Sequence, residues 1–406
     1  MSVIKYNTLD EQSNLKLAQF LTQNNNPTEK EIICWLRLWK LWGKVNIFLA
    51  KFGCVFKTLE YITNLPSTQN LLLSQEEAQK LHEEAKKFGA QILVPTSMNY
   101  PSELKKIEDF PMVLYALGNI ELLKKPAFAI VGSRAASVET MQISYNFSQE
   151  LSKAGFVIVS GFANGIDTSA CNGALKYGTI QVLGSGLKVP YPKNNIDLFK
   201  KVVENDGLFL TEFPLSSPAK PSNFPTRNRI ITGLSKGVLI GQANRRNGVS
   251  GTLVTLRIAI MQGKEIFACP NSILDERSKI CNDLLKNGTA HFTTSIEDIL
   301  SIIGDSLKNT RSTIAKYTVQ ERLQKLDLLT QKEENSEIQL IPETDEEKLS
   351  AIDKVYSMLS TSAISVNEIT NATGLSVSCV QESLTELELC GKITVNHIGK
   401  YTRCLI

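Results

Sequence analysis

Apolar residues in the middle third of the chain recur in short runs that are separated by glycine-containing breaks and amphipathic stretches. Runs without alternation are typical of strands buried on both faces, and spacings of about 20 to 30 residues leave room for crossover helices. The pattern therefore predicts an α/β fold with a doubly wound parallel sheet. The six predicted strands lie at 127–132, 155–161, 179–186, 207–212, 237–241 and 265–270.

The stretch between the first two predicted strands shows how a helix would cover the sheet. Ile143, Phe147 and Leu151 follow one another at intervals of four residues, so they share one helical face. Polar residues precede each of them and would face solvent. We expect this helix to pack its apolar face on the sheet.

All three tryptophans of the chain, Trp35, Trp39 and Trp42, fall within eight residues. Their spacing predicts that one helical face carries them. A base-stacking platform is one interpretation, but such stripes are more often buried, so we favour the core of a small all-α domain within 27–90. The segment 41–53 also fits a helix–turn–helix pair that holds a phosphate backbone.

The C-terminal region begins after an acidic, polar segment at 331–348 that is typical of a linker. Apolar positions then predict a helix around Val355, a capping box at 365–368 opens a second helix, and 378–391 predicts a third. A β-hairpin turning near Gly399 follows. Three helices and a hairpin are the order of a winged helix.

The charge of the third helix argues against duplex DNA as its ligand. It carries Glu382, Glu386 and Glu388 and neither Lys nor Arg, so it would repel phosphates. We therefore favour protein contact or a structural role over duplex binding. The predicted domains are an N-terminal helical, SAM-like domain at 1–95, a Rossmann-like domain at 96–305, a linker at 306–345 and a winged-helix-like domain at 346–406.

Composition is that of a globular chain, with 42% hydrophobic and 21% charged residues among 406. No apolar run reaches the roughly 20 residues that span a bilayer, and the first residues do not resemble an export signal, so we expect a cytoplasmic protein without a membrane segment. Eight cysteines without a C-x-x-C pair and three separated histidines predict reduced thiols and no metal site.

Charge is distributed unevenly although 44 Lys and Arg nearly balance 41 Asp and Glu. The segment 213–264 contains eight cations and neither Asp nor Glu. Drift in a loop-rich region is one explanation. The alternative, which we favour, is an anionic ligand.

Three of the predicted strands lead into loops rich in Gly and Ser, at 132–137, 160–167 and 184–187. Ligands of doubly wound sheets bind at the carboxyl ends of the strands, where backbone N–H groups can meet phosphate. Arg134 adds a planar cation there. Each loop taken singly also fits a tight strand-to-helix turn.

Nucleotide cofactors are not expected. The first loop has one glycine, Gly132, where dinucleotide binding needs G-x-G-x-x-G, and the second strand ends without the acidic residue that would bind ribose. No G-x-x-x-x-G-K-[ST] phosphate loop occurs either. These observations argue against NAD and against a phosphate-loop NTPase.

Seven motifs follow one another along the predicted sheet: "AIVGSR", "SGFANGID", "VLGSGL", "YPKNN", "TEFP", "FPTRNRIITGLS" and "SGTLVT", and "YPSELKKIEDFPMVLYALGN" leads into it. They give the chain a resemblance to the DprA/Smf family of bacterial DNA-processing proteins over about 340 residues. It implies binding of single-stranded DNA without sequence preference, protection of incoming DNA, and loading of RecA recombinase on it during natural transformation. It also implies a homodimer, with single-strand-binding protein as a further partner.

The expected DNA-binding site combines phosphate contacts with base stacking. Arg134, Arg227 and Arg229 would present cations around one rim, and Phe224 would stack on a base or staple the following helix. Asn228 and Asp167 are expected to hold loops by hydrogen bonds. The positions expected to contact DNA are Gly132, Ser133, Arg134, Ser160, Gly161, Gly165, Gly184, Gly186, Lys220, Phe224, Arg227, Asn228, Arg229, Arg245, Arg246, Ser250, Gly251 and Thr252.

Two other functions compete with this interpretation. Related Rossmann-like enzymes cleave nucleoside monophosphates at the N-glycosidic bond with an acid in a G-T-x-x-E motif, where this chain has Thr255, leaving Glu212 as the only substitute. A sequence-specific regulator acting through the winged module is disfavoured by its acidic third helix. The departures from the family pattern are a longer loop at 244–249, Gln242 for Glu, Cys171 for His, Asn271 for Gly, and Pro221 for Lys beside Lys220.

Overall fold

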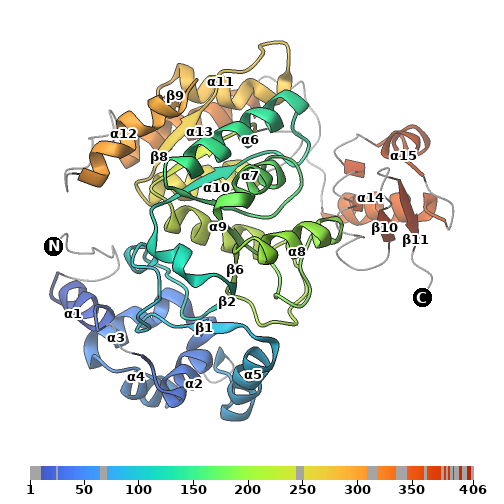
Figure 1. Cartoon of the computed structure of the whole chain (residues 1–406). Helices are drawn as coiled ribbons and strands as arrows, with labels where there is room; N and C mark the ends of the chain where they lie inside the picture. The colour runs from blue at the N-terminus through green and yellow to red at the C-terminus, as the bar shows by residue number, and fades with distance from the viewer. Residues whose placement is uncertain are drawn as a thin grey trace. The chain divides into compact units, whose positions relative to one another are not determined.

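The computed structural model describes residues 11–23, 26–64, 71–243, 251–308, 318–334, 345–360 and 364–375, and, beyond these, 379–380, 383–384, 387, 393–395 and 400–403. The chain forms two compact units, with the boundary after Lys325. The larger unit contains the N-terminal helices and the main sheet, and the smaller contains the C-terminal module (Figure 1).

The main sheet confirms the predicted doubly wound topology. Its described strands lie in the order β1-β2-β6-β5-β4-β3-β7-β8-β9. The pairs from β6 to β9 are parallel, whereas β1 and β2 form an antiparallel edge on β6. The bounds are β1 Gln91–Leu93, β2 Leu114–Gly118, β3 Ala127–Val131, β4 Val157–Ser160, β5 Thr179–Val182, β6 Leu208–Thr211, β7 Gly237–Ile240, β8 Glu265–Ala268 and β9 His291–Phe292.

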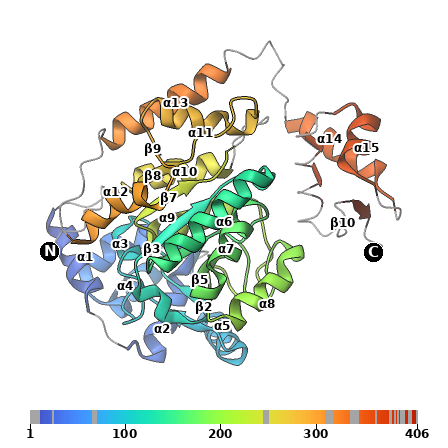
Figure 2. The ribbon, with the colours of Figure 1, turned by 45° about the horizontal axis from the view of Figure 1, so that its top comes forward.

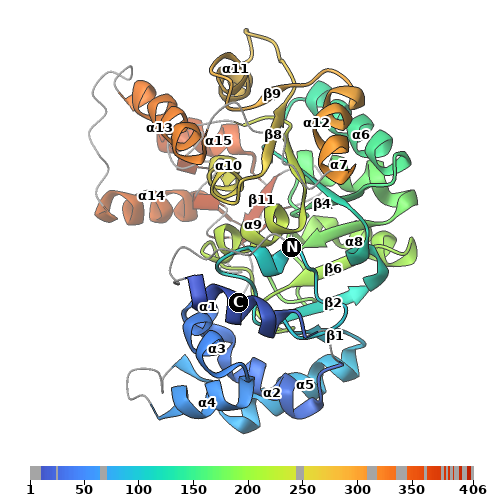
Figure 3. The ribbon, with the colours of Figure 1, turned by 90° about the vertical axis from the view of Figure 1, so that its left-hand side faces the viewer.

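Helices cover both faces of this sheet, as Figure 3 shows edge-on, with α9 and α10 on one side and α6, α7 and α12 on the other. Every residue of β3 and β7 is buried, which explains their continuous apolar runs. Helix α6 lies over the sheet (Figure 2). Its Phe147 and Leu151 are buried in the core, and Ile143 packs against them, as predicted. The helix bounds are α6 Val138–Lys153, α7 Ile166–Ala174, α8 Ile196–Glu204, α9 Asn223–Leu234, α10 Gly251–Met261, α11 Lys279–Lys286 and α12 Ile296–Lys308.

The N-terminal region is helical, as predicted. Trp35 is fully buried and its ring stacks at 6.2 Å from that of Phe20, which supports the core interpretation. The expected single helical face is wrong, however, because α2 ends at Leu38 and a 3-10 helix starts at Trp39. The side chain of Trp42 lies outside the described residues. The helices are α1 Glu11–Leu21, α2 Glu29–Leu38, α3 Asn46–Phe52, α4 Val55–Thr63 and α5 Gln75–Phe88.

The smaller unit contains the predicted winged helix. Ser365 and Glu368 form the expected capping box, and an apolar core joins the helices to β10. Val355, Leu359, Ile369, Val380, Leu384, Leu387 and Ile393 form this core. The acidic residues of the third helix and the turn at Gly399 lie outside the described residues. The elements are α14 Asp345–Met358, α15 Val366–Thr373, β10 Ile393–Val395 and β11 Tyr401–Arg403.

The range predicted as a linker, 306–345, contains a helix, α13 Val319–Glu334. Arg322 of this helix is buried and donates to the Lys264 carbonyl at 3.1 Å, and Lys325 donates to the Asn287 carbonyl at 2.7 Å. The first turns of α13 therefore pack on the larger unit. None of the helices in the described ranges is long and apolar enough to cross a membrane.

Candidate functional site

The predicted loops meet at the carboxyl edge of the sheet, beside the point where the strand order reverses. From β3 the chain continues to β4 on one side and later returns to β7 on the other, so the loops after β3 and β7 diverge there. Such a switch point is where doubly wound sheets bind ligands. The Ser133 amide donates to the Gln242 carbonyl at 2.7 Å and the Ile166 amide to the Ser133 carbonyl at 3.3 Å, which ties three loops together.

The glycines of these loops serve the packing of the loops against each other. A Cβ atom on Gly165, whose φ is +75°, would lie 2.4 Å from the Ser133 carbonyl oxygen, and one on Gly186 would lie 2.1 Å from that of Leu215. Atoms of the chain itself also face Gly132, Gly161 and Gly184. These contacts support the tight-turn interpretation of each loop.

An aromatic ring and an exposed cation form the outer part of the site. The Arg134 side chain is exposed, and its guanidinium carbon lies 5.3 Å from the centroid of the half-buried Phe224 ring. Tyr191 flanks the same ring at 5.8 Å between centroids. Sequence reasoning missed Tyr191 as a site residue, although it belongs to the quoted "YPKNN". Lys220 is exposed one turn before Phe224.

The ring of Phe224 packs on the glycine-containing loop 184–187, which follows β5. A Cβ atom on Gly184 would lie 3.0 Å from the ring, and the Asn223 side chain donates to the Gly184 carbonyl at 2.9 Å. The ring is therefore both packed on its own unit and partly open to solvent. Both earlier interpretations of Phe224, staple and stacking surface, fit this position.

Arg227 does not lie on the exposed rim, so that expectation was wrong. Its side chain is 4% exposed and donates to the carbonyls of Gly161 and Val182, the ends of two neighbouring strands. The physical reason is the buried Asp167, which attracts the guanidinium. Burial lowers the pKa of Arg227 to about 10, which the Asp167 carboxylate opposes.

Asp167 holds the loop after β4, as predicted. Its carboxylate accepts from the backbone amides of Gly161 at 3.1 Å and Ala163 at 3.4 Å. Burial raises the pKa of Asp167, while Arg227 and these amides lower it. Asn228 was likewise expected to hold a loop by hydrogen bonds. Its side-chain oxygen accepts a hydrogen bond from Arg227 Nε at 3.2 Å.

Arg229 is also inside, where the sequence predicted an exposed cation. It is 5% exposed and pairs with Glu212 at 2.7 Å and with Asp109 at 3.1 Å. Burial raises the pKa of Glu212, and the Arg229 guanidinium opposes that shift. The Arg229–Glu212 ion pair joins the end of β6 to α9, the helix that carries Phe224.

The other predicted positions differ in exposure. Ser160 is fully buried and donates to the Ile130 carbonyl at 2.7 Å, so it is structural. Thr252 is 8% exposed, and Gly251 at the start of α10 has open space where a Cβ would lie. Arg245, Arg246 and Ser250 lie outside the described residues.

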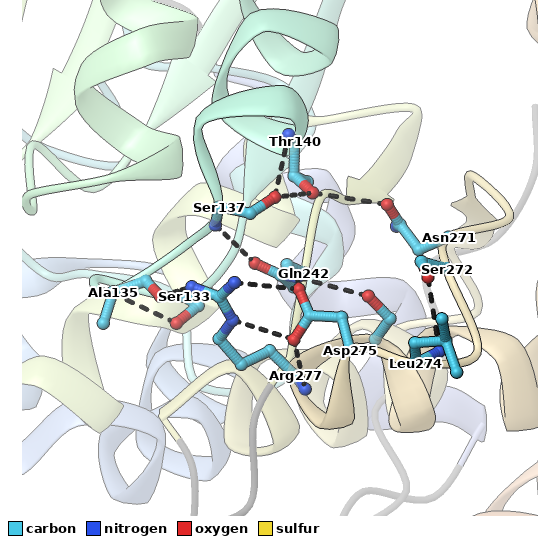
Figure 4. Close-up of polar contacts among 11 residues, drawn as sticks. Ser133, Ala135, Ser137, Thr140, Gln242, Asn271, Ser272, Leu274, Asp275 and Arg277 are labelled. Carbon is cyan, nitrogen blue, oxygen red and sulfur yellow. Dashed lines mark hydrogen bonds and ion pairs between the residues drawn. The ribbon is translucent and has the colours of Figure 1, made fainter.

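Gln242, noted only as a departure from the family pattern, organises the switch point (Figure 4). Its side-chain oxygen accepts from the Ser137 amide at 2.9 Å, and its nitrogen donates to Asp275 at 3.1 Å and Ser278 at 3.2 Å. A glutamate could accept from Ser137 but could not donate to Asp275. The amide thus suits a position between a donor and a carboxylate.

Comparison with known proteins places this geometry in a family. The model for DNA recombination-mediator protein A matches residues 91–304, and the DprA winged helix domain matches 342–396. DNA processing protein DprA of Streptococcus pneumoniae is 44% identical over 205 residues, 50% of this chain and 70% of that protein. Protein Smf of Synechocystis is 31% identical over 331 residues, 79% of this chain and 82% of that protein.

A solved structure agrees with these matches. The X-ray structure of DNA processing protein A from Streptococcus pneumoniae superposes with a TM-score of 0.53 at 32% identity, covering 73% of this chain and 95% of that one. The family matches include the sheet with its loops and the winged helix alike. The chain belongs to the DprA/Smf family of DNA-processing proteins.

Proposed function

We propose that the chain binds single-stranded DNA without sequence preference at the carboxyl edge of its main sheet. The observation that carries this proposal is the contact between the exposed Arg134 guanidinium and the Phe224 ring. A cation beside an accessible aromatic face is the combination that unpaired bases and their phosphates require. Membership of a family described as DNA recombination mediators supports the same ligand.

In this proposal the cationic and aromatic side chains have separate roles. Arg134 and Lys220 contact phosphates, together with Arg245 and Arg246 of the loop after β7. Phe224 stacks on a base, and stacking tolerates any base because every base has a π-face. The buried Arg227 and Arg229 hold α9 against the neighbouring loops and do not contact the DNA.

We further propose that the bound strand is protected and passed to RecA recombinase during natural transformation. A homodimer and single-strand-binding protein are the other proposed partners, and the winged module at 346–406 contacts a protein or is structural. We also propose an N-terminal helical domain at 1–95, a Rossmann-like domain at 96–305, a connecting segment at 306–345 and a winged-helix-like domain at 346–406. Family membership supports this set of proposals.

We propose no hydrolytic activity on nucleoside monophosphates. The substitute acid, Glu212, is 1% exposed and paired with Arg229, so a substrate could not reach its carboxylate. Thr255, in the place of the usual acid, is buried and donates back to the Gly251 carbonyl at 3.0 Å. Release of free base from a nucleoside monophosphate above a buffer control would contradict this proposal.

The central test compares oligo-dT with a duplex of the same length at several salt concentrations. We expect tighter binding of oligo-dT, with an affinity that falls steeply as salt rises. Equal affinity for duplex in direct competition would refute the proposed ligand. RecA loading is tested separately, as recovery of RecA filament formation on a strand coated with single-strand-binding protein.

A further inference from the structure

The loop between β8 and α11 carries an apolar tip that the proposed site does not use. We call residues 271–277 the finger. Ile273 and Leu274 at its tip are 90% and 91% exposed. Val138, 73% exposed, lies on the first turn of α6, whose Thr140 hydroxyl donates to the Asn271 side chain at 3.3 Å. Adjacent, almost fully exposed aliphatic side chains are costly in water unless a ligand covers them.

Hydrogen bonds brace the base of the finger (Figure 4). Asn271 and Asn282 exchange two bonds, of 3.1 and 3.0 Å, between backbone and side chain. The Leu274 amide donates to the Ser272 hydroxyl at 3.2 Å, which fixes the turn at the tip. Gln242 donates to Asp275 at 3.1 Å. The tip is thus held in place before any ligand binds, which lowers the entropy cost of binding.

The finger is continuous with the proposed DNA site. Arg277 at its end donates to the Ala135 carbonyl at 3.4 Å, and the neighbouring residue, Arg134, contacts the Phe224 ring. The finger follows β8, which pairs with β7 next to the switch point. A strand bound along Arg134 would therefore pass the base of the finger.

The charge of the finger indicates which part of the strand it would meet. Arg277 donates to both oxygens of Asp275, at 2.8 and 3.0 Å, and these hydrogen bonds hold the pKa of the Asp275 carboxyl below its usual range. Glu276 adds a further acid. Because its cation is matched by acids, the finger would release few counterions from DNA. Its apolar tip suits the bases and not the phosphates.

We propose that Ile273 and Leu274 form a wedge that inserts against unstacked bases of a bound single strand while Arg134 holds its phosphates. This inference rests on the proposed function and deepens it. Aliphatic wedges that part neighbouring bases are a general device of nucleic-acid-binding proteins. The loop after β3 would then hold phosphates of the strand, and the loop after β8 would contact bases in addition to the base that stacks on Phe224.

The test uses a double variant, Ile273→Ser with Leu274→Ser, in the full chain. The probes are oligo-dT and a strand of the same length made of abasic residues. We expect the double variant to bind oligo-dT about tenfold more weakly than the wild type does, with the same salt slope. Both proteins should bind the abasic strand with the same affinity. Met261→Ser, which removes an apolar side chain that is 64% exposed on α10, is the matched control and should change neither affinity.

The outcomes separate this inference from the function on which it rests. Wild-type protein that fails to bind oligo-dT refutes the proposed function. Wild-type binding with an unaffected double variant refutes the wedge alone, as does an equal loss on both probes. A changed oligomeric state with unchanged DNA affinity would instead assign the tip to contact between copies of the chain. Because both side chains are exposed, the double variant should have the same melting temperature as the wild type.

Discussion

The guanidinium carbon of Arg134 lies 5.3 Å from the centroid of the Phe224 ring, so the loop after β3 and the first turn of α9 meet through a cation and an aromatic face. The two side chains come from positions 90 residues apart in the sequence. Arg134 is exposed, whereas Phe224 is half-buried over Gly184. Charge and stacking can therefore be removed one at a time.

Replacing Arg134 with Ala should weaken binding of oligo-dT and lower the salt slope by about 0.7, because each single-strand phosphate contact releases roughly that many counterions. Affinity measured by fluorescence anisotropy across a salt series checks this. Arg134→Lys is the matched control, since it keeps the charge and should keep the slope. An Arg134→Ala slope equal to that of the wild type would contradict the phosphate contact.

Replacing Phe224 with Ala should weaken binding by about 1–3 kcal/mol while leaving the salt slope unchanged, because stacking releases no counterions. Phe224→Tyr should retain most of the affinity, since it keeps the π-face. A cooperative melt of each variant is needed first, because the ring also packs on Gly184. If a folded Phe224→Ala protein bound as tightly as the wild type, the ring would be only a staple.

The extent to which the sheet could be predicted follows from burial. The six strands recognised in the sequence are β3 to β8, which have buried residues on both faces and hence mostly apolar sequences. Of the three missed strands, β1 and β9 are at the edges of the sheet, and β2 lies between β1 and β6. Strand β9 has two residues, His291 and Phe292, and Phe292 is 62% exposed, so no apolar run marks it. Strand β1 has three residues, of which only Leu93 is buried.

The site was predictable in its loops but not in its exposed cations. Gly-rich breaks after strands mark the loops, and they meet at one edge as expected. Whether an arginine in the acid-free segment faces solvent depends on acids elsewhere in the sequence: Asp167 near Arg227, and Glu212 and Asp109 at Arg229. The absence of acids within 213–264 therefore did not mean that its cations lack acidic partners.

Glu84 of α5 offers a test of how the N-terminal helices are attached. Its carboxylate accepts from Lys188 at 2.7 Å and Ser216 at 2.9 Å, and the hydrogen bond from Lys188 lowers its pKa. A lowered folded-state pKa stabilises the fold above the unfolded value, near 4.5, and this stabilisation disappears as pH falls through the folded pKa.

We therefore expect Glu84→Gln to lower the free energy of unfolding by about 0.5 kcal/mol at pH 7 and not at about pH 3. Urea denaturation at the two pH values measures the difference. Glu83→Gln, an exposed position in the middle of the same helix, is the control and should have little effect at either pH. An equal loss for Glu84→Gln at both pH values would mean that shape, and not charge, holds this contact.

Removing the chain from Glu346 onward should leave affinity for oligo-dT within about threefold of the full chain. The segment 378–391, which is predicted to form the third helix of the winged module, contains Glu382, Glu386 and Glu388 and neither Lys nor Arg, so we expect no counterion release from it. The truncation leaves the larger compact unit intact. Affinities of both forms at one salt concentration decide the point, and a much larger loss would show that the winged module contacts the strand.

Arg227→Ala should act on stability and not on the phosphate contacts. The side chain is 4% exposed and bonds the carbonyls of Gly161 and Val182, and its removal leaves the buried Asp167 carboxylate without its cation. Breaking such a buried charge pair costs about 3–5 kcal/mol, so urea denaturation should show a loss of that size. Adding Asp167→Asn in the same chain should recover part of it, because the uncompensated charge is then gone.

Arg227→Ala should leave the salt dependence of DNA binding unchanged. At a temperature where the variant is folded, the salt slope of its affinity for oligo-dT should equal that of the wild type, in contrast to Arg134→Ala. A stable Arg227→Ala protein with a lower slope would show instead that the guanidinium leaves its carbonyl partners and contacts a phosphate of the bound strand.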